Sequence, residues 1–194
     1  MIYLISDEHY GHEKVIEFGS RPFKNGIEMN EQLIKNFQIT VNPDDLIYHL
    51  GDFGLCNRQM VNTILAQLPG KHILIMGNHD RQQVTGANWT AVLSQAVLPL
   101  GKHRFLLNHR PKIELPDDID GVFHGHVHSP KRDRDYPNLA WFNVNLSVEQ
   151  IEYRPISLKK AFYRFITQKN KYLKAKIDKK RAWWRRNGSN ENKV

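Results

Sequence analysis

Five short groups of polar side chains in this sequence could together bind metal ions. Each group follows an apolar run and combines carboxylate, imidazole and amide side chains. The groups are Asp7-Glu8-His9, Gly51-Asp52, Gly77-Asn78-His79-Asp80, Asn108-His109-Arg110-Pro111 and Gly125-His126-Val127-His128. Mixed ligands of this kind suit Mn²⁺, iron or Zn²⁺ better than a metal selected by thiolates, and they argue against a Ca²⁺ cage. We therefore expect a site for two divalent metal ions, with manganese as the first choice and Fe, Zn, Ni or Mg as alternatives.

Hydrolysis of a phosphate ester is the chemistry that such a site would serve. The negative oxygens of the ester repel nucleophiles, and its alkoxide is a poor leaving group. Two divalent cations about 3.5–4 Å apart neutralise these oxygens and acidify a water to hydroxide. Cations this close need an anionic bridge, and Asp52 is the best candidate because it stands alone behind its apolar run. Gly51 before it would let the backbone and a metal ion approach closely.

The apolar runs before the five groups are predicted to be buried strands. They span residues 2–5, 46–50, 73–76, 105–107 and 122–123. A ligand just past the end of a strand has a rigid support. Asp7 and His9 are two residues apart, as are His126 and His128, so in extended backbone each pair projects to one face.

Helical patterns separate several of these runs. Asn30 can cap a helix that runs through Phe37, and Asn57 can cap another that ends before Pro69-Gly70. A third helix is expected over residues 89–98. Because strands and helices alternate, the sequence predicts an α/β fold with a layered core and a largely parallel sheet.

In their order along the chain, the five groups resemble the motifs of the calcineurin-like metallophosphoesterase family. The resemblance covers residues 1 to about 150, and no ligand is missing. It implies a four-layer α/β/β/α sandwich with the site at the strand ends. Three stretches are similar to the small single-domain bacterial and phage members, namely residues 7–12, 21–23 and 48–53. Asn108 departs from the pattern, because many members have Ser or a smaller residue there, and we expect no ligand to be lost by it.

The family pattern also implies a role for each residue of the site. One metal ion would be held by Asp7, His9, Asp52 and His128, and the second by Asp52, Asn78, His109 and His126. His79 would contact the phosphate and protonate the leaving group, and Asp80 would orient His79.

Five residues are candidates for binding the substrate. Asn78 and His79 would contact the phosphate, and His12 could reach it from the loop after His9. Arg21 and Arg110 each have a guanidinium group that can bind a phosphate through two hydrogen bonds. For each of the two residues, we expect equally that it has no specific role.

The remaining histidines are expected to have no part in the chemistry. His49 and His124 fall within strand-like runs, where a buried and hydrogen-bonded histidine is the common outcome. His72 and His103 open strands and are predicted to be exposed.

Length and composition indicate one globular domain of 194 residues. No apolar stretch approaches the length of a membrane span, and no charged and apolar leader precedes the first strand, so we expect a cytoplasmic protein. The single cysteine, Cys56, excludes an internal disulfide framework and is expected to be incidental.

Positive charge is concentrated at the C-terminal end. From residue 159 onward there are 13 Lys and Arg against two acidic residues, whereas residues 1–158 carry 15 basic and 18 acidic side chains. We divide the chain into a metallophosphoesterase domain (1–158), a basic amphipathic helix (159–187) and a disordered tail (188–194). The helix has a narrow apolar stripe, within a sector about 60° wide. It could dock on the body, bind nucleic acid or another polyanion, or lie on a membrane surface.

Three functions remain open at this stage. The leading one is a metal-dependent hydrolase of phosphomonoesters or phosphodiesters, such as a nucleotide or a cyclic phosphodiester, acting through a metal-activated hydroxide. The second is a nuclease or nucleic-acid end-processing enzyme in which the basic extension holds the backbone. The third is a non-catalytic scaffold with the same fold, which loss of His79 or of ligands would indicate; none is lost here.

Overall fold

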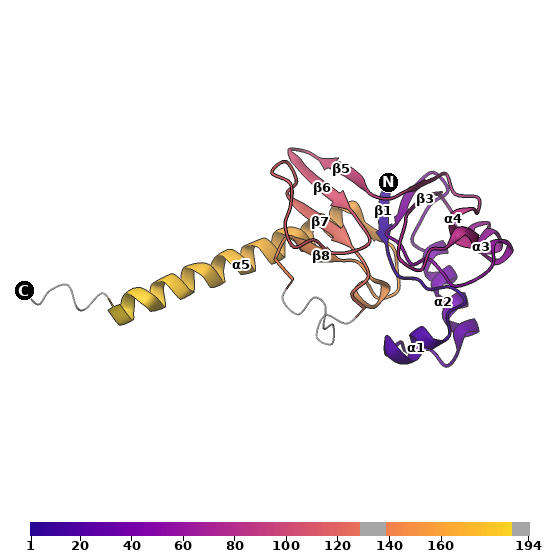
Figure 1. Cartoon of the computed structure of the whole chain (residues 1–194), viewed down its shortest axis with the longest axis horizontal. Coiled ribbons are helices and arrows are strands. Elements are labelled where there is room, and N and C mark those ends of the chain that lie inside the picture. Colours follow the sequence, from indigo (N-terminus) through magenta and orange to yellow (C-terminus); the bar gives the residue numbers. More distant parts are fainter. Residues whose placement is uncertain (129–138, 188–194) are drawn as a thin grey trace, which may run out of the picture.

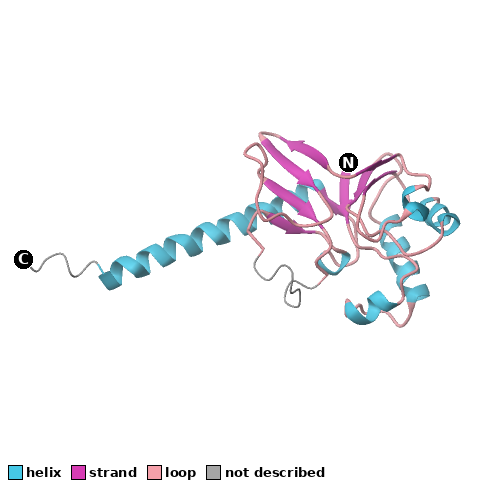
Figure 2. Ribbon diagram, viewed as in Figure 1, coloured by secondary structure: helices cyan, strands magenta, loops and turns pink. Residues whose placement is uncertain are grey.

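The computed structural model contains two sheets that contribute to one hydrophobic core (Figure 1). It describes residues 1–128 and 139–187, with side chains as far as Trp183. The tail that the sequence predicts to be disordered, residues 188–194, lies outside the described residues. Figure 2 shows the helices gathered beside one sheet, and a single long helix that leaves the other.

The first sheet has five strands in the order β4-β3-β2-β1-β9. Their bounds are β1 Ile2–Ile5, β2 Leu46–His49, β3 Lys71–Ile75, β4 Ala91–Leu93 and β9 Ile156–Ser157. The first four are parallel to their neighbours, and β9 runs antiparallel to β1. The strands predicted at 2–5, 46–50 and 73–76 are therefore confirmed.

The second sheet has four strands in the order β5-β6-β7-β8. They are β5 Ala96–Leu100, β6 His103–Leu107, β7 Gly121–His124 and β8 Asn143–Asn145. β6, β7 and β8 are parallel, whereas β5 is antiparallel to β6. The strands predicted at 105–107 and 122–123 are confirmed and are longer than expected.

Helices pack against both sheets. They are α1 Lys14–Phe18, α2 Gly26–Gln38, α3 Arg58–Leu65, α4 Gln82–Thr85 and α5 Leu158–Asn187, with a 3₁₀ turn at Val148–Gln150. In α2, Phe37 stacks on His49 of β2, with ring centroids 5.7 Å apart. In α5, Phe165 packs edge-on against Phe105 of β6 at 4.9 Å. The predicted α/β class, with two largely parallel sheets and helices on each, is confirmed.

The helix predicted over residues 89–98 is wrong. This stretch contains strand β4 and the first three residues of strand β5. Val92 pairs with Leu74 of β3, and Leu98 pairs with Phe105 of β6. The spacing of apolar residues could not reveal this, because pairing with strands distant in the sequence outweighs local propensity. Pro99 lies in β5, at the edge of its sheet, where a missing N–H group is tolerated.

Helix α2 begins earlier than predicted, at Gly26. Its N-cap is Asn25, whose side-chain oxygen accepts a hydrogen bond from the N–H of Glu28 at 2.9 Å. The Glu28 carboxylate accepts in turn from the N–H of Lys24 at 2.7 Å. Such side chains satisfy backbone donors that the first helical turn leaves free. The predicted cap of α3 is confirmed, because Asn57 accepts from the N–H of Met60.

Helix α5 is 30 residues long and projects from the body (Figure 1). Its first turns bury Leu158, Ala161 and Phe165 in the core. The expected division at residue 158 therefore falls where helix and body are packed together, and a truncation there would uncover the core. Tyr172 still stacks on Trp141 of the body, with ring centroids 5.9 Å apart, and every residue from 171 to 183 is exposed. No helix in residues 1–128 and 139–187 has the length and apolarity needed to cross a membrane.

Candidate active site

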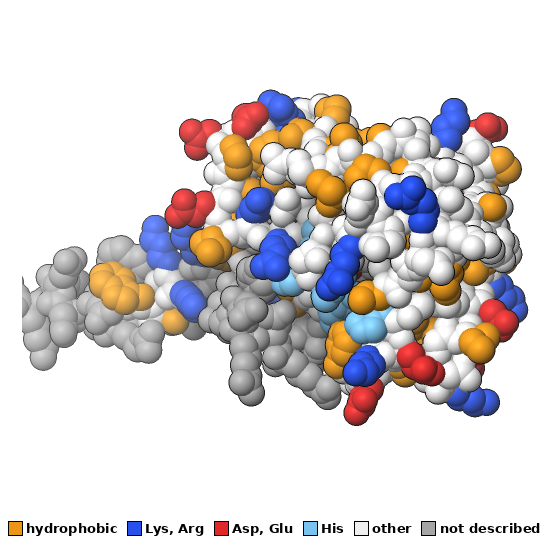
Figure 3. All heavy atoms as spheres, turned by 45° about the vertical axis from the view of Figure 1, so that its right-hand side comes forward, with side chains coloured by type: hydrophobic (Ala, Val, Ile, Leu, Met, Phe, Trp, Pro, Cys, Tyr) orange, Lys and Arg blue, Asp and Glu red, His pale blue; other side chains and the backbone are white. Residues whose placement is uncertain are grey.

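The five polar groups meet at the carboxyl ends of strands from both sheets. Asp7 follows β1, Asp52 follows β2, Asn78 and His79 follow β3, His109 follows β6, and His126 and His128 follow β7. An isolated bridge between Ser6 and Ser147 joins the sheets at this edge. Figure 3 shows histidine side chains at the surface here, with Lys and Arg side chains beside them.

Asp7, His9 and His128 form the first cluster of metal-binding atoms. Each offers one ligand atom, and the three atoms lie within 4.8 Å of one another. His128 Nε2 is 3.7 Å from Asp7 Oδ1. Asp7 and His9 are buried. This is the geometry in which one cation could be held between two imidazoles and a carboxylate.

Asp52, His109 and His126 form the second cluster, again with ligand atoms within 4.8 Å of one another. His109 Nε2 lies 3.3 Å from Asp52 Oδ2. It also lies 3.1 Å from Asn78 Oδ1, which places this amide oxygen in the same cluster.

Asp52 lies between the two clusters. Its Oδ2 atom is 3.8 Å from His9 Nε2 and 3.3 Å from His109 Nε2. A carboxylate in this position can contact a cation in either cluster. The fold thus brings together all seven residues that the sequence suggests as ligands.

The first cluster also has a buried polar atom that a cation would satisfy. Within residues 1–128 and 139–187, His9 Nε2 has no hydrogen-bond partner, although it is buried. Such an atom is rare in a folded protein and needs an explanation. Imidazole nitrogens and carboxylate oxygens converging on one point are donors for a divalent transition-metal ion. The residues present therefore fit the metal ions that the sequence suggests.

Two of the imidazole rings are oriented by hydrogen bonds from their other nitrogen. His128 donates from Nδ1 to the Glu149 carboxylate at 2.8 Å, and His109 donates from Nδ1 to the carbonyl oxygen of Leu50 at 2.8 Å. Both bonds fix the tautomer that leaves Nε2 free to bind a metal ion. Sequence reasoning missed Glu149, because it lies in a 3₁₀ turn outside every motif.

Arg21 supports the site from behind and does not face the substrate, which corrects the prediction for this residue. Its side chain is fully buried. The guanidinium donates to the Glu149 carboxylate at 2.8–2.9 Å and to the carbonyl oxygens of Asp7 at 2.6 Å and Glu8 at 2.8 Å. These acceptors engage all three guanidinium nitrogens, so Arg21 ties Glu149 to the backbone of the first ligand group.

Replacing Glu149 with alanine should weaken metal binding by about 10–100-fold, the usual effect of losing a partner behind a ligand. The variant frees the His128 ring to rotate and leaves the Arg21 cation unpaired. Metal affinity can be measured by calorimetry, with circular dichroism to confirm folding. The matched control is Glu114→Ala, an exposed glutamate. Unchanged affinity in the folded Glu149 variant would contradict this role.

Asp80 holds the loop of Asp52 in place, and not the ring of His79 as predicted. Its carboxylate accepts three backbone N–H bonds, from Asp52 and Gly77 at 2.8 Å and from Phe53 at 2.9 Å. In the described part of the chain, no hydrogen bond or ion pair joins this carboxylate to the His79 ring. Burial raises the pKa of Asp80 to about 6, although the N–H of Gly77 lowers it.

His79 is the most accessible of the central histidines. Its side chain is 44% exposed, and its Nε2 lies 4.0 Å from Asp52 Oδ2. Its backbone N–H donates to Asp52 Oδ1 at 2.8 Å, which fixes the position of the residue beside the metal ligands. A ring that is fixed at its base and open to solvent can approach a bound substrate.

His12 and Arg110 lie at the rim of the site. His12 Nδ1 is 3.2 Å from His9 Nδ1, and the centroid of its ring is 6.4 Å from that of His79. Arg110 is exposed and near enough to His126 to help lower the pKa of that ring, after burial and the charge of His109. Both residues remain candidates for contacting a substrate.

Asp52 and His109 form a buried ion pair, with His109 Nε2 3.3 Å from Asp52 Oδ2. Burial alone would raise the pKa of Asp52, but the hydrogen bond from His109 and its charge hold it well below its ordinary value. Burial alone would lower the pKa of His109, but the bond to Asp52 raises it to about 9. The site concentrates negative charge, and a bound cation would replace the His109 proton as the partner of Asp52.

Four ligands adopt a left-handed backbone conformation that side chains rarely take. The φ angles are 61° at Asp7, 56° at His9, 57° at Asp52 and 68° at His126. Such conformations are costly and persist where the surrounding structure imposes them. At Gly51, with φ of 95°, a Cβ atom would lie 2.6 Å from His109 Nδ1 and 2.7 Å from the Gly77 backbone. Only glycine therefore fits between these ligand loops.

A chain of buried polar groups runs from the first ligand group toward the end of α3. Glu8 contacts His49 Nδ1, His49 Nε2 lies 3.0 Å from His72 Nδ1, and His72 Nε2 lies 3.3 Å from the Leu68 carbonyl oxygen. Burial raises the pKa of Glu8 and lowers those of His49 and His72 to about 3. These contacts fix Glu8, the residue between Asp7 and His9. The prediction that His72 is exposed is wrong, because it is buried in this chain.

Comparison with known proteins identifies the family. The model of the calcineurin-like phosphoesterase superfamily domain matches residues 1–145. The chain belongs to this family. This calcineurin-like phosphoesterase domain is 37% identical to an uncharacterized protein of Methanocaldococcus jannaschii, over 81% of this chain and 86% of that protein. It is 27% identical to the Gene 66 protein of Mycobacterium phage L5, over 64% of this chain and 76% of the phage protein.

A solved structure shares the fold. It is that of a protein of unknown function from Aquifex aeolicus, with a TM-score of 0.66 and 29% sequence identity over 82% of this chain and 96% of that chain. Membership of the calcineurin-like phosphoesterase superfamily supports a metal-dependent hydrolase of phosphate esters in general. The resemblance seen in the sequence is therefore confirmed.

Proposed function

We propose that this chain is a dinuclear metal-dependent phosphoesterase that hydrolyses phosphomonoesters or phosphodiesters. The observation that carries the proposal is the position of Asp52 between two clusters of ligand atoms, each within 4.8 Å. Asp7, His9, Asp52 and His128 would hold one cation, and Asp52, Asn78, His109 and His126 the other. Manganese is our first choice for both, because the ligands are nitrogen and oxygen atoms without a thiolate.

Each residue of the site would have its own role in the reaction. When bound, two divalent cations supply Lewis-acid neutralisation of the phosphate oxygens and lower the pKa of a water. His79, exposed beside Asp52, would contact the phosphate and donate a proton to the leaving oxygen. Asn78 would contact both metal and phosphate. Glu149, Arg21 and Asp80 hold the ligands and the Asp52 loop in place.

The proposed substrates are small and accessible phosphate esters, such as a nucleotide or a cyclic phosphodiester. His79 and Arg110 are open to solvent on this face. A panel of simple monoesters and diesters, cyclic nucleotides and oligonucleotides, assayed with added Mn²⁺, tests the proposal. We expect hydrolysis that chelation abolishes and Mn²⁺ restores at about two ions per chain. Hydrolysis that survives complete removal of metal would contradict the dinuclear site.

We also propose that the projecting part of α5 binds a polyanion, with nucleic acid as the first choice. Residues 171–187 contain eight Lys and Arg against one Asp. Successive residues of a helix are rotated by about 100°, and on this basis the Lys and Arg side chains of residues 171–181 are distributed around the whole helix. The widest gap between two neighbouring cations spans about 100°. A membrane-bound helix needs a broad apolar face, whereas within residues 171–181 only Leu173 and Ile177 lie in that gap. Pairing with a second copy would bring like charges together.

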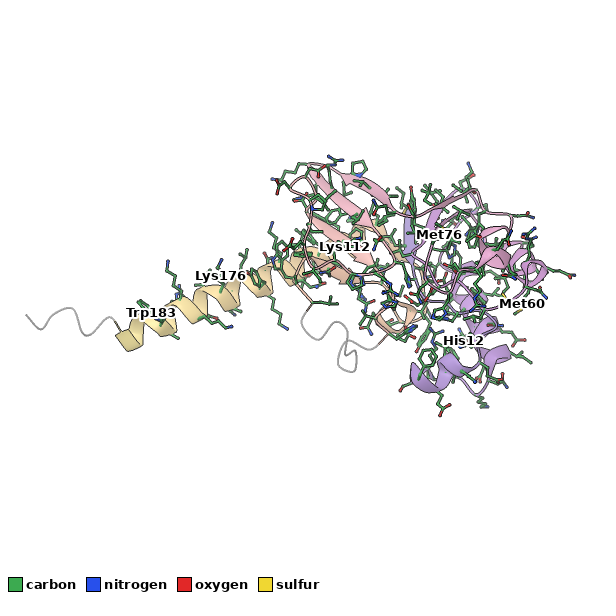
Figure 4. All side chains as sticks on the ribbon, in the orientation of Figure 1. His12, Met60, Met76, Lys112, Lys176 and Trp183 are labelled. Carbon is green, nitrogen blue, oxygen red and sulfur yellow. The ribbon has the colours of Figure 1, made fainter. Side chains whose placement is uncertain are left out.

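We call residues 171–187 the arm. The arm points away from the candidate active site. Figure 4 shows Lys176 and Trp183 on the projecting helix, far from His12 at the rim of the site. Nucleic acid on the arm would therefore be tethered to the enzyme and not clamped over the metal ligands. This geometry favours a hydrolase with a tether over the nuclease alternative. The scaffold alternative has little support, because the seven ligands and His79 are all present.

Changing Lys171, Lys174 and Lys176 together to glutamine should weaken duplex DNA binding and reduce its salt dependence. Each lost phosphate contact lowers the slope of log affinity against log salt by about 0.9, so the slope should fall by up to about 3. Fluorescence anisotropy at several salt concentrations measures this. A matched control changes the exposed Lys14, Lys24 and Lys102 to glutamine. Binding to anionic vesicles but not to DNA would assign the arm to a membrane surface instead.

A further inference from the structure

A pocket of about 370 Å³ opens directly beside His79. It lies between the loop that follows Asp52 and the segment that follows His79. Its walls are formed by Gly54, Leu55, Cys56, Asn57, His79, Arg81, Gln83 and Val84. None of these residues except His79 belongs to the metal-binding groups. The pocket therefore adjoins the candidate active site at His79, and none of the seven suggested metal ligands lines it.

The position of His79 decides which part of a substrate would enter this pocket. The argument rests on the function proposed above, in which His79 donates a proton to the leaving oxygen. A proton donor must come within about 2.6–3.2 Å of the atom that it protonates. The leaving alcohol must therefore lie on the His79 side of the phosphate. His79 is also one of the residues that line the pocket, so the body of the alcohol would extend into it.

The walls indicate what kind of alcohol would bind. Leu55 and Val84 provide apolar surface, and Leu55 is 39% exposed. Arg81 and Gln83, which also line the pocket, are exposed and offer N–H donors. A guanidinium also stacks on aromatic faces. The volume lies within the common range of ligand pockets, about 300–1,000 Å³, and exceeds what a short alkyl alcohol would fill.

Asn57 and Cys56 also line the pocket, and they would contact a ligand without taking part in the reaction. The side-chain oxygen of Asn57 accepts the N–H of Met60, and the N–H₂ group of Asn57 can donate to a ligand. Burial raises the pKa of the Cys56 thiol to about 11, which keeps it neutral and unreactive at physiological pH. The pocket therefore presents several donors beside an apolar wall. This chemistry complements a ligand that has a flat ring and many oxygen and nitrogen acceptors.

We propose that this pocket binds the leaving alcohol of the substrate and selects a nucleoside over a small alkyl alcohol. The base would lie between Arg81 and the apolar wall of Leu55 and Val84, and the sugar would lie next to His79. In the reaction, water adds to phosphorus and releases one proton to solvent, the bond from phosphorus to the ester oxygen breaks, and His79 supplies a proton to that oxygen and regains one from solvent. The products are the free nucleoside and phosphate, or a phosphomonoester when the substrate is a diester.

The test compares two substrates that differ only in the leaving alcohol. These are the ethyl ester and the adenosine 5′-ester of the same phosphate group, assayed with Mn²⁺ in the monoester or diester form that the wild-type protein hydrolyses. Their aliphatic alcohols have similar intrinsic reactivity, so a difference in kcat/KM reports contacts with the alcohol. We expect the wild-type protein to prefer the adenosine ester by at least about 10-fold.

Two variants change the pocket in different ways. Leu55→Trp fills it, and Arg81→Ala removes the guanidinium; both positions are partly or largely exposed, so the fold should tolerate the changes. Each should lower the ratio of kcat/KM for the adenosine ester to that for the ethyl ester by about 10-fold, mainly through KM. The control Lys102→Ala, in the turn between β5 and β6, should leave this ratio unchanged.

The outcomes separate this inference from the proposed function. Hydrolysis of both esters with the same ratio in the wild-type protein and both variants would overturn the pocket assignment, while the phosphoesterase function stands. A wild-type preference for the ethyl ester would overturn it equally. Failure of the metal-loaded wild-type protein to hydrolyse any phosphate ester would overturn the proposed function, and the inference with it.

Discussion

Replacing Asp52 with asparagine should remove most of the bound metal and lower turnover by about 10³-fold or more, since metal ions stabilise phosphoryl transfer by several kcal/mol. The substitution keeps the shape of the side chain but removes its charge. Asp52 Oδ2 is the oxygen that lies within 3.8 Å of His9 Nε2 and within 3.3 Å of His109 Nε2. Both clusters therefore lose their shared anion.

Elemental analysis of the purified protein measures the first effect, and steady-state hydrolysis with added Mn²⁺ measures the second. In the wild-type protein we expect about two ions per chain, and in the Asp52→Asn variant fewer than one. Asp44→Asn is the matched control, because Asp44 is exposed in the turn before β2. Full metal content in the Asp52 variant would show that this residue does not join the clusters.

Replacing His79 with alanine should have the opposite signature, with metal retained and chemistry impaired. A positioned proton donor contributes about 10²–10⁴-fold to turnover, and this is the loss that we expect. His79 lies outside both clusters of ligand atoms, and its side chain is 44% exposed. Removing the ring should therefore leave the metal ions in place.

The loss should also depend on the leaving group. An ester whose alcohol needs no proton to leave, such as a nitrophenyl ester, should be affected less than an alkyl ester. The matched control is His103→Ala, at the start of β6 and outside both clusters. If metal content and turnover fall in parallel in the His79 variant, His79 is a ligand and the roles must be reassigned.

The comparison of sequence with structure shows where local patterns suffice. The ligand groups could be recognised because each joins a buried apolar run to a few metal-binding side chains. The short strands β1, β2 and β3 are predictable for the same reason, since parallel strands buried on both faces consist of continuous apolar residues. Asn57 could be identified as the cap of α3, because a cap depends only on residues within one turn.

Patterns failed where the deciding contacts are distant in the sequence. Residues 91–93 and 96–100 form strands because β3 and β6 are available to pair with them. Arg21 was expected to face the substrate, but Glu149 and the carbonyl oxygens of Asp7 and Glu8 enclose it. Asp80 was expected to orient its neighbour His79, but it binds backbone N–H groups of the Asp52 loop.

By itself the sequence determined the types of the ligands, their order, and the strands that carry them, because these depend on short runs of residues. The tertiary structure alone decided which ligands share a cluster, which polar residues support them, and where a leaving group could lie. Those properties depend on distances between side chains such as His128 and Glu149, which are 21 positions apart in the chain but in direct contact in the fold. Hydrogen bonds and charge interactions act over a few ångströms in space, and separation along the chain does not measure that distance.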